Sequence, residues 1–296
     1  MTETGIAANE GRGQALIVLL AGACVIGVGP ALVRLSEVGP AAAAFWRLAF
    51  AIPLLGALAA RNSAGVGLPS RMALLAGIVF ALDLGFWHYG IAYTSVAKAT
   101  VLSNLTPVVV TAVSWLVFKQ KPGKLFLAAV ALAVGGAWIM ALARGSGSLG
   151  RAPALGDALS AATAIWYALY FLAVTAARKT EGATRIMFWS TVTGTPLMLL
   201  AAFGLREQLT PATSAGWSAL VGLGLMHVAG QGSIAWALGR LPTPVASVVV
   251  LIQPVVAGIL GWILFNEMFG AWQAFGGGLA LGGVVLAQWA SRPRTS

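Results

Sequence analysis

The chain has 296 residues, of which 59% are apolar and 9% are charged, against roughly 25% charged residues in an average soluble domain. This composition excludes a soluble globule, a disordered chain, a coiled coil and collagen, and it indicates a polytopic membrane protein. The formal net charge of +10 comes mostly from residues in short segments between apolar runs, where it indicates orientation in a membrane and not nucleic-acid binding. Cys24 is the only cysteine, which excludes an intrachain disulfide.

Apolar runs between charged residues and Gly or Pro breaks predict ten transmembrane helices. A bilayer requires ~20 apolar residues per helix, and the runs have about this length. Because they do not alternate with polar residues at every second position, they are not β-barrel strands. We expect the helices at residues 14–33, 41–60, 71–93, 97–118, 124–142, 154–176, 183–203, 214–238, 244–265 and 271–290.

The loop charges predict the orientation of these spans. Ten spans place both termini on one side, whose loops hold twelve of the 18 Lys and Arg residues, while the opposite loops hold five. Because positive loops stay in the cytoplasm, we expect cytoplasmic tails at residues 1–13 and 291–296 and an extra-cytoplasmic linker at 143–153. The N-terminal residues lack a signal-peptide pattern, so the first helix should be retained. We assign the chain to the cytoplasmic (inner) membrane as a multi-pass protein.

The two halves, residues 14–142 and 154–290, repeat each other in sequence. At offsets of 143 and 147 residues the matches are Phe45-Trp46 with Phe188-Trp189, Pro53 with Pro196, and Pro107 with Pro254. Since five helices per half is an odd number, the second half must enter the membrane from the opposite face. The sequence therefore predicts an all-α membrane protein with ten transmembrane helices as two inverted five-helix repeats, an arrangement typical of secondary transporters.

The runs from Gly90 to Leu142 and from Ile234 to Trp289 resemble the two EamA-type repeats of the drug/metabolite transporter superfamily. The most specific parts of the resemblance are Pro107, Pro254 and the segment 265–269 before the Gly-rich last helix. The resemblance implies ten helices, a central cavity and, for many bacterial members, export of amino acids or related metabolites. The aromatic amino acid exporters of this superfamily are similar also in the aromatic sixth helix.

One position departs from the family pattern, because Gln120 stands in the first half where Glu267 stands in the second. An acidic side chain is therefore not required at this position in both halves. The chain has no nucleotide-binding Gly-x-x-x-x-Gly-Lys-Ser/Thr motif and no metalloprotease or nucleophile-elbow motif. We therefore favour a transporter without a cofactor over an enzyme.

Two opposite charges lie inside the predicted spans at nearly equal depth, Arg47 on the second helix and Asp83 on the third. An uncompensated charge at the centre of a membrane costs ~2.5–3.5 kcal/mol on the insertion scale. We therefore predict an ion pair between them, or a water-linked form of it. Alternatively, Arg47 attracts a substrate carboxylate or Asp83 titrates; we favour the structural pair.

Aromatic and polar residues near the midplane are candidates for substrate contact. Ten of the eleven Trp residues lie near a predicted helix end, as an aromatic belt requires, and Trp166 does not. Tyr170 lies one turn from Trp166, and His227 and Gln231 form a similar pair on the eighth helix. Packing, or a hydrogen bond to a backbone carbonyl, is the alternative role for each pair.

Further candidates surround two prolines at corresponding places in the halves. Asn104 precedes Pro107 and Gln253 precedes Pro254. Each proline removes a backbone hydrogen bond and frees a carbonyl, so we predict hinges at both, with an ordinary packing kink as the alternative. His88, nearer the outer edge, completes the candidate set. The Gly-rich stretches around Gly135 and from Gly276 to Gly283 indicate close helix packing, within the chain or between protomers.

Together these features predict a secondary transporter that exports amino acids of broad specificity, including aromatic ones, by alternating access through a central cavity. Its partners would be the small-molecule substrate and membrane lipid, with no nucleic acid, and we favour a monomer. Efflux of drugs or other metabolites is the alternative within the same class, and a channel or membrane-embedded enzyme the alternative outside it. Asp83, His88 and His227 are the titratable groups that proton coupling would use; without them, transport would be facilitated export.

Overall fold

The computed structural model describes residues 3–62, 65–94, 102–117, 119, 121–143, 152–265 and 270–290, and every regular element within them is helical. The helices of the first half are α1 (Glu3–Ile26), α2 (Gly29–Leu35), α3 (Pro40–Arg61), α4 (Arg71–Tyr93), α6 (Thr106–Leu116) and α7 (Lys124–Leu142). Those of the second half are α8 (Pro153–Ala177), α9 (Ala183–Gly204), α10 (Ser214–Met226), α11 (Gly232–Leu238), α12 (Thr243–Val249), α13 (Gln253–Phe265) and α14 (Ala271–Ala290). A π-helical turn, η1 (His227–Gln231), joins α10 to α11, and a 3₁₀ turn, η2 (Val250–Ile252), joins α12 to α13.

These helices follow the ten predicted spans. Within the described residues, seven helical segments are long and apolar enough to cross a membrane, and α6, α7 and α14 complete the set. Large apolar side chains such as Leu200, Phe203 and Val285 are at least 60% exposed. A soluble surface does not expose so many groups of this kind, whereas lipid chains cover them.

The ends of several spans differ from the predictions. The helix α1 begins at Glu3, so that residues 3–13, predicted as a tail, continue the first helix. The fourth span, predicted from residue 97, is helical at residues 102–103 of its described part, is interrupted by a turn at 104–105, and continues as α6 from Thr106. Gln120, the segment 266–269, residues 144–151 of the predicted linker and the C-terminal residues 291–296 lie outside the described residues.

Local sequence signals explain where the helices begin. Proline stands in the first turn of α3, α6 and α8. Backbone N–H groups there have no acceptor within the helix, so the N–H that proline lacks costs no hydrogen bond. Ser70 caps α4 by accepting a hydrogen bond from the Ala73 N–H at 3.1 Å, and Thr213 caps α10 by accepting from the Gly216 N–H at 3.1 Å. These caps satisfy N–H groups that the helix itself leaves without partners.

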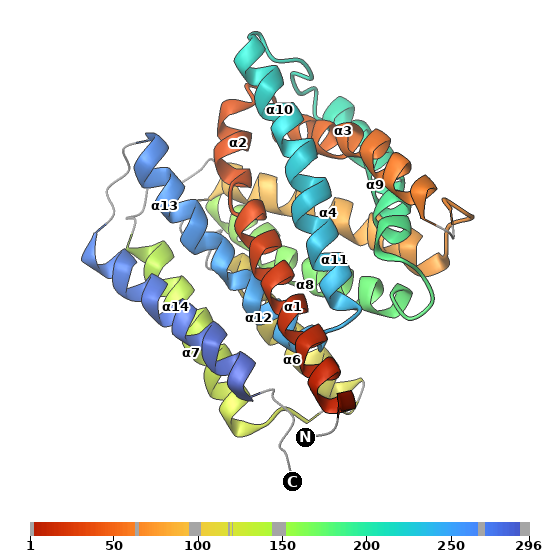
Figure 1. Ribbon diagram of the computed structural model, residues 1–296. Helices are drawn as coiled ribbons and strands as arrows, with labels where there is room; N and C mark the ends of the chain where they lie inside the picture. The colour runs from red at the N-terminus through yellow and green to blue at the C-terminus, as the bar shows by residue number, and fades with distance from the viewer. Residues whose placement is uncertain are drawn as a thin grey trace.

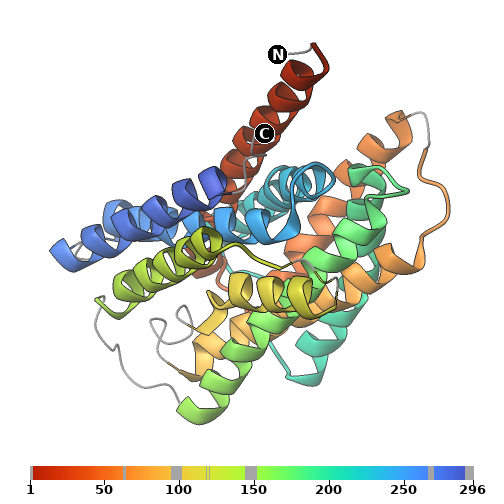
Figure 2. The same cartoon turned by 90° about the horizontal axis from the view of Figure 1, so that it is seen from below.

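Corresponding helices of the two halves pack side by side and run in opposite directions. The Asn62 side chain donates to Thr184 at 2.6 Å at one end of the α3–α9 pair, and the Ala42 N–H donates to Glu207 at 2.9 Å at the other. In the α7–α14 pair, Gly136 lies against the α14 backbone. Figures 1 and 2 show the α7–α14 pair on one side of the bundle and the α3–α9 pair on the other.

The remaining contacts between the halves occur twice, each time between equivalent spans with the two halves interchanged. The first span of one half packs on the third span of the other: α1 on α11, and α8 on α4. The α4–α8 pair is antiparallel, because Thr94 donates to Asp157 at 2.7 Å near one end while the Phe80 and Tyr170 ring centroids lie 4.7 Å apart further along. The two halves are thus interleaved over the whole bundle.

Two loops tie the halves together at the end of the bundle opposite the N-terminus of α1 and the C-terminus of α14 (Figure 1). We call them the latch loops, residues 36–39 and 205–213. In the first, the Glu37 carboxylate accepts hydrogen bonds from the Thr213 hydroxyl at 2.7 Å and from the Ala212 and Thr213 N–H groups at 3.1 Å. The Thr213 side-chain bond, followed by the backbone bonds, lowers the pKa of Glu37 against a smaller opposing effect of desolvation.

The end of the bundle at which α1 begins and α14 ends is closed by apolar packing. In α12, Val245, Val248 and Val249 are at most 2% exposed, and Leu19 of α1 and Leu238 of α11 are equally buried. These side chains belong to one continuous core. Solute cannot pass this end without a rearrangement of the core.

Candidate substrate cavity

A cavity of about 550 Å³ lies between the two halves, within the range of roughly 300–1,000 Å³ usual for small-molecule sites. Helices α1 to α4 and α6 supply one part of its wall, and α8, η1, η2 and α13 supply the other. Many of its residues lie near the ends of helices on the latch-loop side, including Arg34 of α2 and Ala92 of α4. The cavity therefore extends from the middle of the bundle toward the latch loops, away from the closed apolar end.

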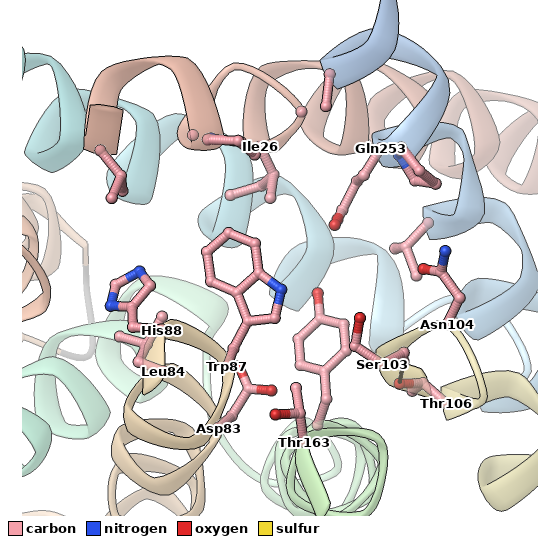
Figure 3. Close-up of a pocket in the computed structure, with 18 of the residues that line it drawn as sticks. Ile26, Asp83, Leu84, Trp87, His88, Ser103, Asn104, Thr106, Thr163 and Gln253 are labelled. Atoms are coloured by element: carbon pink, nitrogen blue, oxygen red, sulfur yellow. Dashed lines mark hydrogen bonds between the residues drawn. The ribbon is translucent and has the colours of Figure 1, made fainter. Parts of the chain in front are cut away.

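One face of α4 forms a stripe along this wall. Phe80, Asp83, Leu84, Trp87 and His88 all line the cavity, at the spacing of three and four residues that puts helical side chains on one face. Figure 3 shows the Trp87 ring above Asp83 and Thr163, which lie close to each other in this view, with His88 to its left. The stripe thus combines an aromatic surface, a carboxylate and an imidazole.

Several buried polar atoms in the wall have no hydrogen-bond partner in the part of the chain that the structure describes. They are Arg47 Nε, His88 Nε2, Asn104 Nδ2, Gln231 Oε1 and Gln253 Nε2. A buried polar atom without a partner costs about 1–3 kcal/mol, and water or a solute in the cavity relieves that cost. In Figure 3, Asn104 and Gln253 lie across the cavity from His88 and Asp83.

The hydrogen bond of His88 to the backbone determines which of its nitrogens is free. Its Nδ1 lies 2.9 Å from the Pro40 carbonyl oxygen. Because a carbonyl only accepts, Nδ1 carries the hydrogen, and Nε2 of the neutral ring is an acceptor. The wall therefore offers both kinds of group: donors on Arg47, Asn104 and Gln253, and acceptors on His88 and Gln231.

Arg47 and Asp83 line the same cavity without a direct ion pair. They interact electrostatically, yet among the described residues no nitrogen–oxygen contact of 4.0 Å or less joins them. The Arg47 guanidinium lies 5.5 Å from the centre of the Phe80 ring, within the range of a cation–π contact. The water-linked form of the predicted pair stays a prediction.

Within the described part of the chain, His, Cys, Asp and Glu side chains form no group of three that could hold a metal ion. The wall carries hydrogen-bonding groups, two opposite charges and aromatic rings. This set is suited to binding a polar solute.

The EamA-like transporter family model matches residues 13–142 and, a second time, residues 154–289. Together the two matches span nearly the whole chain. The chain belongs to the EamA-like transporter family. This family lies within the drug/metabolite transporter superfamily, so the protein is a multi-pass membrane transporter and not an enzyme. The two matches also bear out the division into two EamA halves that the sequence offsets predict.

Two known proteins are similar over most of this EamA-like transporter. An "Uncharacterized transporter" of Archaeoglobus fulgidus is 27% identical over 223 residues, which cover 75% of this chain and 78% of that protein. A solved structure titled "Crystal structure of protein" superposes with a TM-score of 0.79 at 17% identity, covering 95% of this chain and 100% of the other. At that identity the structure supports the fold alone.

The predicted contact residues of this EamA-like transporter divide into two groups. His88, Asn104, Gln231 and Gln253 line the cavity. Trp166, Tyr170 and His227 do not belong to the wall. Tyr170 and His227 are each 1% exposed and pack behind Phe80, with ring centroids 4.7 Å and 5.4 Å from it.

The residues behind the wall also contact the protein, although Trp166 Nε1 and His227 Nδ1 have no hydrogen-bond partner among the described residues. The Tyr170 hydroxyl donates to the Met187 sulfur at 3.5 Å, and His227 Nε2 lies 3.0 Å from the Thr191 hydroxyl. Trp166 packs edge-to-face on Phe86 at 5.7 Å. Substrate contact by these three residues stays a prediction, and their contacts are those of a layer that supports the wall.

Sequence reasoning missed Tyr167, Thr163 and Trp87, which line the cavity. Thr163 and Tyr167 lie one turn apart on α8, and Tyr167 stacks parallel to Tyr170 at a centroid distance of 6.0 Å. Successive residues of an α-helix are rotated by about 100° about its axis, so Tyr167 and Trp166 lie on different faces of α8. Trp87, predicted as part of an interfacial belt, instead faces the cavity, and its neighbour His88 was the available signal.

Both predicted hinges coincide with breaks in a span. Pro107 stands in the first turn of α6, after an irregular turn at residues 104–105, and does not line the cavity. Pro254 lines the cavity just after the 3₁₀ turn η2. A third break, the π-helical turn η1, carries Gln231 into the wall. Turns of this kind are frequent at functional sites.

Proposed function

We propose that this EamA-family transporter exports amino acids, including aromatic ones, by alternating access through the cavity between its halves. The observation that carries the proposal is a cavity between the halves whose wall combines partnerless polar atoms with opposite charges and aromatic rings. Drug efflux would need fewer fixed polar contacts, because apolar compounds gain affinity from buried surface alone. An amino acid has charged, hydrogen-bonding and apolar parts that correspond to these groups.

The antiparallel pairing of α3 with α9 and of α7 with α14 supports an inverted repeat. Two halves that exchange equivalent contacts and run in opposite directions are related by an axis in the membrane plane. Such halves can exchange conformations, which moves the opening of a central site from one face to the other. In the present state the cavity extends toward the latch loops, and its other end is closed.

The proposal includes the membrane in which the protein lies and the side to which its termini face. We place the chain in the cytoplasmic membrane with both termini in the cytoplasm, on the excess of Lys and Arg in the loops at that end. The latch loops then lie outside the cytoplasm, and the present state faces outward. Reporter proteins fused to each terminus test this orientation, which an extra-cytoplasmic terminus would overturn.

A counterflow assay with the purified protein in liposomes tests the proposed function. Liposomes loaded with unlabelled phenylalanine should accumulate labelled phenylalanine transiently and saturably, because a carrier exchanges one solute for another. A panel of other amino acids, with and without a pH gradient, defines the range and the coupling. Uptake without saturation or counterflow would indicate a channel, altered substrate an enzyme, and no amino-acid transport in either condition would remove this substrate class.

A further inference from the structure

Among the described residues, the two membrane-embedded charges of the cavity wall have no ionic partner within 4.0 Å. Arg47 and Asp83 are 6% and 8% exposed, and both line the cavity. Among the described residues, the Asp83 carboxylate makes no hydrogen bond or ion pair within 4.0 Å, and Arg47 Nε has no hydrogen-bond partner. The fold thus holds a cation and an anion in one chamber and keeps them apart.

We propose that Arg47 and Asp83 are the specificity-determining residues of this cavity, binding the carboxylate and the ammonium of a zwitterionic α-amino acid. This inference rests on the proposed function and assigns the part of the substrate that is recognised. A zwitterion brings one opposite charge to each residue and leaves the chamber neutral. A simple amine or a simple carboxylic acid compensates one of the two charges and leaves the other exposed to a medium of low dielectric constant.

The neutral groups of the wall reinforce this recognition. Asn104 Nδ2 and Gln253 Nε2 are donors that a carboxylate can accept from, whereas Gln231 Oε1 and His88 Nε2 are acceptors for an ammonium group. By distance and angle none of the four atoms has a hydrogen-bond partner among the described residues, although the Gln231 and Gln253 side chains interact with the Tyr167 hydroxyl. Hydrogen bonds to charged groups are the stronger ones, so a zwitterion gains more from these atoms than a neutral solute does.

The aromatic residues of the wall provide a place for the substrate side chain. The Trp87 ring lies above Asp83 and Thr163 in Figure 3, and Tyr167 lies one turn from Thr163 on the same helix. Flat apolar rings accept aliphatic and aromatic groups alike. The charges therefore fix the amino-acid head, while the rings tolerate several side chains.

Two sets of ligands test the proposal, each a zwitterion with its two single-charge analogues. The first set is phenylalanine, phenethylamine and 3-phenylpropionate; the second is leucine, 3-methylbutylamine and 4-methylpentanoate. Equilibrium binding to the purified protein in nanodiscs should be about 10- to 100-fold tighter for each zwitterion than for its analogues, the factor expected for one lost charged contact. This comparison needs no variant.

Charge-removing variants assign each end of the ligand. Arg47→Gln should weaken zwitterion binding by about 10- to 100-fold and remove the preference for phenylalanine over phenethylamine. Asp83→Asn should instead remove the preference for phenylalanine over 3-phenylpropionate. Arg47→Lys and Asp83→Glu keep the charges and should keep both preferences, which separates recognition from a general loss of structure.

The failures of the two proposals are distinguishable. If wild-type protein carries amino acids in counterflow but binds the single-charge analogues equally well, the assignment of Arg47 and Asp83 is wrong and amino-acid transport stands. Unchanged preferences in folded Arg47→Gln and Asp83→Asn proteins lead to the same conclusion. If wild-type protein neither binds nor exchanges phenylalanine or leucine, both proposals are wrong.

Discussion

Gly136→Ala is expected to destabilise the transporter, whereas Gly135→Ala, one residue earlier, is expected to leave it folded. A Cβ atom on Gly136 would overlap the backbone of α14, with the Gly276 carbonyl oxygen at 2.6 Å and the Leu279 carbonyl carbon at 2.8 Å. Backbone cannot rotate away as a side chain can, so the α7–α14 pair must separate at a cost of about 1–3 kcal/mol. At Gly135 nothing lies within 4 Å, and Ala gains roughly 1 kcal/mol in helix propensity.

Thermal unfolding in detergent, followed by intrinsic fluorescence, measures the difference between the two variants. Equal melting temperatures for Gly136→Ala and Gly135→Ala would contradict the close approach of α7 to α14. The same contrast exists in the other half, where a Cβ on Gly283 would overlap Ala133 but one on Gly282 would meet only Leu132 at 3.9 Å. Each half thus contributes a glycine to the crossing, which is close packing within the chain.

Glu207→Ala is expected to release the latch loops at the N-terminus of α3. The Glu207 carboxylate accepts from the Ala42 N–H at 2.9 Å and from the Tyr89 hydroxyl, and so joins α3 and α4 of one half to the loop of the other. An anion at a helix N-terminus is favourable because the N–H groups and the helix dipole point toward it. Loss of these charged hydrogen bonds should cost about 1.5–3 kcal/mol.

Hydrogen–deuterium exchange and thermal unfolding test the latch. The backbone amides at the start of α3 should exchange faster in the Glu207→Ala protein than in the wild type. The melting temperature of the Glu207→Ala protein should be lower. Gln208→Ala is the matched control, because the Gln208 side chain donates only to Thr210 within the same loop, at 2.9 Å. If the two variants exchange and melt alike, Glu207 does not hold the halves together.

Helix boundaries could be predicted from the sequence because charges, Gly and Pro interrupt the apolar runs. The seventh span, for example, was expected at residues 183–203 and is α9, Ala183–Gly204. The break at residues 27–28 has such a signal in Gly27, Gly29 and Pro30, although the first span was predicted to run through it, and Pro254 marks the end of η2; the π-helical turn η1 carries no comparable signal. This turn depends on packing between spans, which an apolar run does not encode.

The cavity wall was predictable where polar groups stood near prolines, as for Asn104 and Gln253, whereas Arg47 and Asp83, expected as a structural pair, also line it. It was not predictable from midplane depth alone. Trp166 and Tyr167 are neighbours at almost the same depth, yet only Tyr167 belongs to the wall, because the contact of α8 with α4 fixes the rotation of the helix. The rotation of α8 about its axis thus depends on a contact between the two halves, which the sequence of one helix does not encode.

The central claim is that one cavity between the halves opens alternately to each side of the membrane. In a Cys24→Ser background, Thr163→Cys places a single thiol in the wall, and a membrane-impermeant thiol reagent can be applied to either face of sealed vesicles. We predict labelling from the latch-loop face without substrate, and labelling from the opposite face as well during exchange of phenylalanine. Labelling from one face alone under every condition, or from neither, would contradict alternating access through this cavity.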